Sequence, residues 1–410
     1  MAIRKPIFVM PLDLGTVVCG NAASGNPVFN LAEFLTPGLT WRSDGTTNLW
    51  ARGQFDTAQA INFCAMLAAN AQASTTIRLR LGGSQAEVDG TPLTPTVDSA
   101  GIATAATYTA TSSFSGFGAA LTSNGAGLRD GTINSGAAAT SHATTAIAGQ
   151  AIFIDFGASY AVETVELSNN VSFGAAFLNG AVLAGSNNGS TYTDIATIAG
   201  GSDGVLLSIP VGTSYRYLRL LGNANGLGVG EFRAKLLTGY DSGALTFINP
   251  GITREDGLYH SHLEIPATAR STWWRIDIAG HTGDFEASSL VLGKQIVPSR
   301  FYNIDYERGV EDLGEISFGR WAVPDETPGA ILRTLGITLA WQTEAEFEAN
   351  FRPMMEKLGK RGPVYCCFDP DPTTYRQGKT YLGVMRKPPF ARGVPKPLTV
   401  TQEFDILSLY

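Results

Sequence analysis

Residues 151–174 read AIFIDFGASYAVETVELSNNVSFG, and this stretch decides the fold class. It contains two short apolar runs, Ala151–Phe156 and Val162–Leu167, each the length of one β-strand. Further runs follow at Ala181–Ser186, Thr193–Ile198, Gly204–Ile209 and Tyr215–Leu221. Runs that recur about every 8–12 residues are typical of β-sandwiches, so this part of the chain predicts one.

The segment upstream, 91–150, resembles a linker because only three of its residues are charged: Asp98, Arg129 and Asp130. Apolar anchors nevertheless recur in it, and it leads directly into the strand at Ala151. These anchors are Tyr108, Phe114, Phe117 and Leu121. We therefore predict that residues 91–243 form an insertion with a core of its own.

Strand-and-turn sequence also flanks the insertion, at 27–90 and 244–300. Residues 75–81, TTIRLRL, alternate apolar and polar side chains as a half-buried strand does. After the insertion, further runs occur at Leu258–Ile265, Trp273–Ile278 and Ser288–Leu292. The two flanks together predict one β-rich unit that the insertion interrupts.

The last segment, 301–410, contains one clear helix. Thr343 and Glu346 form a capping box, Gly359 stands where a C-cap belongs, and Pro353 should bend the helix. Its apolar stripe consists of Phe347, Phe351, Met354, Met355 and Leu358. Extended segments on both sides predict an α+β unit, and residues 1–26 predict an N-terminal strand or arm.

Composition excludes several classes of protein. A formal charge of −7 over 410 residues gives no basic footprint for nucleic acid, and no apolar run reaches the roughly 18 residues of a membrane span. Pro6, Pro11 and Asp13 interrupt the N-terminal apolar run, so we expect no signal peptide and synthesis in the cytoplasm. The four cysteines lack CxxC spacing and predict free, buried thiols.

The insertion resembles a discoidin-type (coagulation factor 5/8 C-type) module, a jelly roll that binds sugars, lipids or protein surfaces through loops at one end. The resemblance covers roughly 90 residues. It rests on AIFIDFG from Ala151, VETVELSNNVSFG from Val162, VLAGSNNGSTYTDIATIAG from Val182, YRYLRLLG from Tyr215 and GVGEFRAKL from Gly228. It implies a carbohydrate-binding module.

The flanks repeat the same plan more weakly, in Leu49–Gly83, Trp273–Gly280 and Glu286–Ile296. We infer a mainly β fold with two discoidin-like jelly rolls, one inserted in the other, plus a C-terminal α+β unit. This arrangement resembles distal-tail proteins of the bacteriophage tail tip and baseplate. That resemblance implies a virion component made in the host cytoplasm, which forms a homo-oligomeric ring and contacts other tail proteins and a host-surface glycan.

No catalytic constellation is found: the chain has no HExxH, P-loop or EF-hand loop. We therefore expect a non-catalytic structural protein. A polysaccharide-degrading tail enzyme (depolymerase) with a binding module is the alternative, because the spatial separation of two carboxylates cannot be seen in a sequence. A surface adhesin is a third, and the absence of a signal peptide speaks against it.

A sugar site on a sandwich needs an exposed aromatic ring with amide or acid groups on loops. In the insertion the candidates are Phe114, Phe117, Asn124, Arg129, Phe173, Phe177, Asn179, Asn223 and Asn225. In the outer unit they are Trp41, Arg42, Asp44 and Trp50. Core packing is the competing interpretation of the aromatic residues in both sets.

Calcium is the one cofactor that the resemblance suggests, because loops of such modules often hold it, and Asp130 is the candidate ligand. His260 and His262 are two residues apart and so share one strand face with Glu264. A metal site there competes with the interpretation of polar residues on a solvated face. His142 and His281 are predicted to be ordinary surface histidines.

Overall fold

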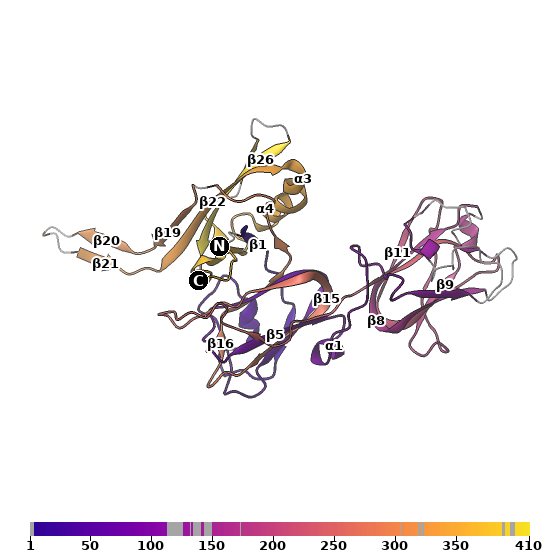
Figure 1. Ribbon diagram of the computed structural model, residues 1–410, viewed down its shortest axis with the longest axis horizontal. Helices are drawn as coiled ribbons and strands as arrows, with labels where there is room; N and C mark the ends of the chain where they lie inside the picture. Colours follow the sequence, from indigo (N-terminus) through magenta and orange to yellow (C-terminus); the bar gives the residue numbers. More distant parts are fainter. Residues whose placement is uncertain are drawn as a thin grey trace. The chain divides into compact units, whose positions relative to one another are not determined.

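The computed structural model describes residues 4–112, 126–131, 133, 150–172, 174–303, 305–318, 321, 324–387, 390–393 and 398–410, and the backbone of 141–142. The chain is mainly β, as predicted, and is coloured along its sequence in Figure 1. It divides into two compact units. The first comprises Met1–Leu79, Ser242–Thr268 and Trp274–Tyr410, and the second comprises Arg80–Asp241 and Ala269–Trp273.

The second unit is built on an antiparallel sheet with the strand order β10-β9-β11-β8-β12-β7, with β6 beside β8. The strands are β6 (Thr109–Ser112), β7 (Ser141–His142), β8 (Ala151–Asn169), β9 (Val182–Ser186), β10 (Thr193–Thr197), β11 (Leu207–Leu221) and β12 (Gly228–Leu236). Outside this sheet lie the short helix α1 (Gln85–Asp89), the 3-10 helices η3 (Ala126–Leu128) and η4 (Ala175–Phe177), and β13 (Tyr240–Asp241).

Two long strands turn this one sheet into a sandwich. β8 and β11 each join two runs that the sequence predicted as separate strands, and that part of the prediction was wrong. Their pairing continues through register shifts near Thr213 and Tyr217, where Gly157 and Gly212 take positive φ angles. Because both strands bend together there, side chains from the two halves share one core, as Ile154 and Leu167 do.

The first unit contains an eight-stranded sheet with the order β18-β1-β23-β24-β26-β22-β19, with β25 beside β26. The predicted N-terminal strand is therefore a member of the C-terminal sheet. The strands are β1 (Ile7–Val9), β18 (Gln295–Ile296), β19 (Glu307–Asp312), β22 (Ile331–Thr343), β23 (Val364–Cys367), β24 (Thr380–Met385), β25 (Phe390–Gly393) and β26 (Thr399–Ser408). A separate two-stranded sheet joins β20 (Glu315–Phe318) and β21 (Pro324–Thr327).

The predicted C-terminal helix is confirmed as α3 (Glu344–Glu346), the π-helical turn η5 (Phe347–Phe351) and α4 (Arg352–Leu358). The Thr343 side chain accepts a hydrogen bond from the Glu346 backbone N–H, as a capping box requires, and Gly359 ends the helix at φ 51°. The π-helical turn precedes Pro353, which lacks the N–H of an α-helical hydrogen bond.

A further, seven-stranded sheet has the order β13-β5-β15-β4-β17, with β14 beside β5 and β2 beside β4. Besides β13, its strands are β2 (Thr16–Cys19), β4 (Trp50–Leu67), β5 (Thr76–Gly82), β14 (Leu245–Thr246), β15 (Leu263–Ala279) and β17 (Ser289–Gly293). β3 (Trp41–Arg42) pairs with β16 (Glu286–Ala287), and the 3-10 helices are η1 (Val28–Ala32) and η6 (Gln377–Lys379). Phe63 of β4 and Tyr365 of β23 pack together, so the two large sheets share a core.

All four cysteines are free, and Cys64, Cys366 and Cys367 are buried as predicted, whereas Cys19 is partly exposed. Burial raises the pKa of the Cys64 thiol to about 12, so it is protonated at neutral pH. None of the helices in the described part of the chain is long and apolar enough to cross a membrane.

Candidate binding surfaces

Asparagine amides fasten the loops at one end of the sandwich. Leu221 pairs with both Ala151 and Val182, so the loops around 175–181 and 222–227 emerge together. Asn223 Nδ2 donates to the carbonyl oxygens of Ala176 (2.8 Å) and Asn179 (2.5 Å), and its Oδ1 accepts from the Asn225 N–H (2.7 Å). The Asn223 amide is therefore used within the protein.

The other two predicted asparagines differ in exposure. Asn179 is half-buried and exchanges two hydrogen bonds with the Gly201 backbone, at 2.8 and 3.1 Å, so its amide also fixes a loop. Asn225 is exposed, and with the described residues its Nδ2 makes only a long hydrogen bond, 3.3 Å, to the Ala176 carbonyl. Of the three amides, that of Asn225 is the most available to a ligand.

Several predicted residues cannot be placed. Phe114, Phe117, Asn124 and Phe173 lie outside the described residues. Asp130 is exposed just after the 3-10 helix Ala126–Leu128. Among the residues that the structure describes, no group of three or more His, Cys, Asp or Glu side chains is arranged to hold a metal ion. The role of Asp130 as a calcium ligand stays a prediction.

The solvent-facing side of the sandwich carries an aromatic and cationic surface that the sequence analysis missed. Along β8 and β11, Ile154 and Leu218 point into the core, so Phe153 and Arg219, which pair across the strands, point outward. The Arg219 guanidinium lies 4.5 Å from the centre of the Tyr192 ring, and the Phe153 and Tyr192 ring centres are 6.0 Å apart. We call Phe153, Tyr192, Tyr217 and Arg219 the outer platform.

The outer platform continues to Tyr217, where Arg216 lies 4.8 Å from the ring centre and pairs with Asp155 at 3.0 Å. Burial raises the pKa of Tyr192, so its hydroxyl stays protonated. The Nε atom of Arg219 is buried and has no hydrogen-bond partner within the described part of the chain. Half-buried rings beside a guanidinium can stack on an apolar face, and the guanidinium can donate hydrogen bonds at the rim of that face.

In the first unit, the predicted tryptophan cluster does not form one surface. Trp41 is fully buried, its ring packs on Phe285, and its Nε1 donates to the Asn21 carbonyl at 3.0 Å. Trp41 is thus a core residue, and its prediction as a glycan contact was wrong. Arg275 and Arg52 lie 4.5 and 5.3 Å from the Trp50 ring centre, so guanidinium groups already occupy positions over this ring.

The two polar members of that cluster, Arg42 and Asp44, are exposed, but both already form polar contacts within the protein. Arg42 pairs with Asp284 at 2.8 Å. The backbone of Asp44 exchanges hydrogen bonds with the side chain of Asn21. Both residues organise the surface around β3 and β16, and they do not lie beside an exposed tryptophan face.

His260 and His262 are buried, which corrects the expectation of a solvated strand face. His260 Nδ1 accepts from the Ala68 N–H at 3.0 Å, and burial lowers the pKa of His260 to about 3. Burial opposes ionisation of Glu264, but hydrogen bonds from His262 and Arg4 outweigh it and hold the Glu264 pKa at about 2. His281 is also buried, beside Thr75, and is not a surface histidine.

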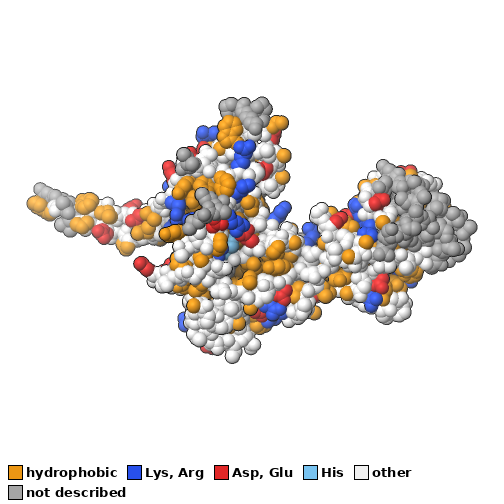
Figure 2. Space-filling view, viewed as in Figure 1, with side chains coloured by type: hydrophobic (Ala, Val, Ile, Leu, Met, Phe, Trp, Pro, Cys, Tyr) orange, Lys and Arg blue, Asp and Glu red, His pale blue; other side chains and the backbone are white. Residues whose placement is uncertain are grey.

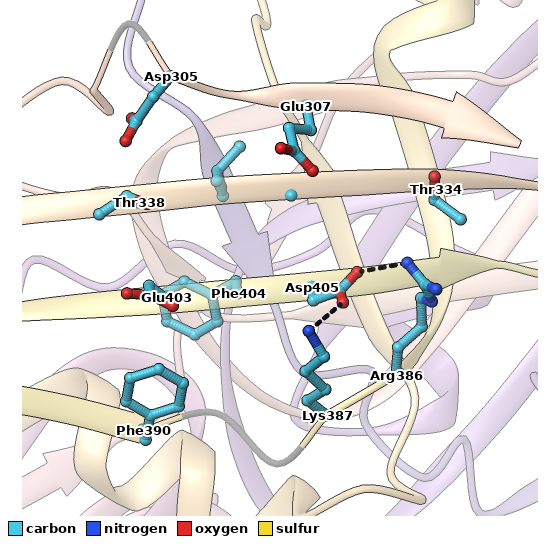
Figure 3. Close-up of a pocket in the computed structure, with 12 residues that line it drawn as sticks. Asp305, Glu307, Thr334, Thr338, Arg386, Lys387, Phe390, Glu403, Phe404 and Asp405 are labelled. Atoms are coloured by element: carbon cyan, nitrogen blue, oxygen red, sulfur yellow. Dashed lines mark hydrogen bonds and ion pairs between the residues drawn. The ribbon is translucent and has the colours of Figure 1, made fainter.

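A polar pocket of about 390 Å³ lies over β22 and β26 in the first unit (Figure 3). Four carboxylates line it, those of Asp305, Glu307, Glu403 and Asp405, together with Phe390. Asp405 contacts Arg386 (3.3 Å) and Lys387 (3.9 Å), whereas Glu307 and Glu403 come from strands on either side of β22. The pocket therefore has one neutralised carboxylate and room for a polar ligand.

Residues 107–232 match the family model described as the F5/8 type C domain. The resemblance predicted from the sequence is thereby confirmed for this segment, which has a discoidin-like sandwich fold. A comparison with curated proteins found no match.

Several solved structures are similar to part of this chain. One is the carbohydrate-binding module CBM62 of Clostridium thermocellum Xyl5A, at 20% identity over 33% of this chain and 96% of that chain, with a TM-score of 0.26. The family 32 module of Clostridium perfringens NanJ, in complex with galactose, has 15% identity over 32% and 94%, with a TM-score of 0.26. A fucolectin from striped bass (Morone saxatilis) serum has 14% identity over 56% and 99%, with a TM-score of 0.29.

Proposed function

We propose that the sandwich of the second unit binds carbohydrate and that the whole chain is a non-catalytic structural component of a bacteriophage tail tip or baseplate. The match of residues 107–232 to the F5/8 type C domain carries the first half of this proposal. The second half extends the sequence resemblance of the flanking and C-terminal segments. In a virion, several copies would present weak sugar contacts together, so that avidity compensates for low affinity.

We place the sugar contact on the outer platform. A pyranose ring has an apolar face that stacks on Phe or Tyr and polar hydroxyl groups at its rim. Phe153 and Tyr192 supply the rings, and Arg219 supplies a guanidinium that has no ion pair with the described residues. The amides of Asn179 and Asn223 at the loop end already form hydrogen bonds with loop backbones. They are therefore less available to a sugar than the outer platform is.

The test is a glycan array and a host-cell binding assay on the full-length chain, with Tyr192→Ala as the site variant. Phe301→Ala is the matched control, since Phe301 is an exposed aromatic residue of the first unit. Saturable binding that Tyr192→Ala weakens and Phe301→Ala preserves supports the proposal. Failure of the wild-type chain to bind any host glycan or host cell overturns the binding half.

The polar pocket over β22 and β26 favours a second candidate function, a polysaccharide-degrading tail enzyme. Such enzymes work with a pair of carboxylates, and Glu307 and Glu403 both line this pocket. Oligosaccharide release from host capsule or lipopolysaccharide, abolished by Glu307→Gln or Glu403→Gln, would establish that activity. Absence of release by the wild-type chain supports the structural role.

A further inference from the structure

A ribbon that extends the first unit has no core of its own. We call residues 307–331 the hairpin arm. Its outer part, β20 and β21, is a separate two-stranded sheet in which all eight residues are exposed (Figure 1, at the left). A two-stranded hairpin by itself is marginally stable in water. The hairpin arm therefore needs a surface to pack against.

The side chains of the hairpin arm indicate what that surface is like. Val310, Ile316 and Phe318 are 66%, 64% and 70% exposed, and Figure 2 shows apolar and acidic side chains along this projection. Between Val310 and Ile331 the sequence has five acidic residues and one basic residue. Contiguous exposed apolar groups mark interaction sites, so the partner surface should offer both apolar area and positive charge.

The first unit itself carries such a surface. A cavity of about 530 Å³ is lined by Arg254, Arg308, Arg333, Lys379 and Tyr375, and we call it the basic pocket. Tyr375 is 69% exposed at this site. A basic cavity with an exposed aromatic ring on a chain of net charge −7 is suited to an acidic, apolar partner.

One of these cations, Arg308, has no carboxylate partner among the described residues. Arg254 pairs with Asp256, and Lys379 pairs with Asp369 at 2.5 Å. Arg308 instead donates to neutral oxygens, those of the Tyr381 hydroxyl (3.0 Å) and the Gly378 carbonyl (2.9 Å), and Arg333 shares the Gly378 acceptor at 3.2 Å. Arg333 also donates to the main-chain oxygen of Tyr410, the last residue of the sequence, at 2.6 and 3.1 Å.

These two guanidinium groups are close enough to repel each other. Burial lowers the pKa of Arg333, and the nearby charges of Arg254 and Arg308 lower it further. A carboxylate brought to this point would relieve the repulsion, and its hydrogen bonds would be charge-assisted.

We propose that the hairpin arm of one copy docks on the basic pocket of a second copy of this chain. The carboxylates of Glu315, Asp325 or Glu326 then meet Arg308, and Phe318 packs on Tyr375. This inference rests on the assembly half of the proposed function and names the surfaces that carry it.

The outer part of the hairpin arm cannot reach the basic pocket of its own chain. The hairpin arm starts beside that pocket, at Arg308, and extends away from it. Ten residues of extended strand, at about 3.3 Å each, place Phe318 roughly 30 Å along the ribbon from Arg308. Docking between copies is therefore head-to-tail. Such heterologous contacts close into a ring when the rotation between copies permits it and otherwise propagate as a filament.

A cross-linking experiment between two variants of the full-length chain tests the docking. One chain carries Ser317→Cys and the other Thr374→Cys, exposed neighbours that leave Phe318 and Tyr375 in place, both in a Cys19→Ser background because the remaining cysteines are buried. The two chains are mixed and treated with a short bismaleimide. Covalent dimers that join one chain of each kind are expected. Each variant alone should give far less dimer, because it lacks one of the two thiols at every contact.

Sedimentation of the wild-type chain separates failure of this inference from failure of the proposed function. Oligomers without a mixed cross-link overturn the docking and leave assembly standing, whereas a chain that stays monomeric and gives no mixed cross-link overturns both. Phe318→Ser should weaken assembly at least tenfold. Leu398→Ser, at an equally exposed residue outside the hairpin arm, should leave assembly unchanged, and equal effects of the two substitutions would contradict the docking.

Discussion

The guanidinium of Arg219 lies 4.5 Å from the centre of the Tyr192 ring, on the solvent-facing side of the sandwich. With the residues described, Arg219 makes this cation–π contact but no ion pair, and its Nε stays unsatisfied. A guanidinium that is not paired with a carboxylate keeps its charge available to an anionic ligand. The outer platform therefore combines aromatic rings with a positive charge that a ligand can contact.

Replacing Arg219 should affect acidic glycans more than neutral ones. Arg219→Gln keeps a donor but removes the charge, so we expect about a tenfold loss of affinity for a uronate or sialylated glycan. The loss for a neutral galactoside should be smaller. Titration calorimetry on the full-length chain measures both, and an equal loss for the two ligands would show that the charge takes no part.

Trp41 should matter for stability and not for binding. Trp41→Ala removes a fully buried ring and should lower the free energy of unfolding by about 3–5 kcal/mol. Trp50→Ala, at a half-buried ring, is the matched control and should cost less than half as much. Urea denaturation followed by circular dichroism provides the comparison. If Trp41→Ala lost glycan binding without losing stability, Trp41 would be a glycan contact and not a core residue.

The two asparagines of the 222–227 loop should differ in how much each contributes to stability, as urea denaturation can measure. Asn223→Ala removes the hydrogen bonds that join two loops and should cost about 1–3 kcal/mol. Asn225→Ala should change stability by less than about 0.5 kcal/mol, because its side chain is exposed and weakly bonded. Similar costs for both substitutions would mean that the loop is not fastened through Asn223.

His260 should make the first unit sensitive to acid. Its pKa in the folded chain is about 3, below the value of about 6.5 in an unfolded chain, so the unfolded state takes up a proton first as the pH falls. The stabilisation is complete above about pH 6.5 and is lost toward pH 3, by up to about 1.4 kcal/mol per pH unit. His260→Asn, which can still accept from the Ala68 N–H, should flatten this dependence. Parallel stability curves for the two proteins would exclude His260 as the cause.

Much of the fold follows from local sequence patterns. The capping residues Thr343 and Gly359 predicted the ends of the C-terminal helix, because caps act through backbone hydrogen bonds within a few residues. The runs at 162–167 and 215–221 predicted strands, but not that the pairing continues through the bends at Gly157 and Gly212. Continuity across a bend depends on the partner strand, which a single segment does not contain.

The candidate site was harder to predict for a similar reason. Aromatic side chains look alike in a sequence whether they pack inside, as Trp41 does, or face outward, as Tyr192 does. The outward position of Phe153 and Arg219 could have been read from the alternation around the buried Ile152, Ile154, Leu218 and Leu220. Their proximity to Tyr192 could not, because it depends on how β9 and β10 pair beside β11.

The most direct test of the binding site is oxidative footprinting of the full-length chain by mass spectrometry, with and without host-surface polysaccharide. Hydroxyl radicals modify accessible aromatic side chains, so a ligand on the outer platform shields them. We predict that the polysaccharide reduces oxidation of Phe153, Tyr192 and Tyr217 and leaves Tyr375 unchanged. Unaltered oxidation of the three platform residues while the polysaccharide is bound would contradict the account.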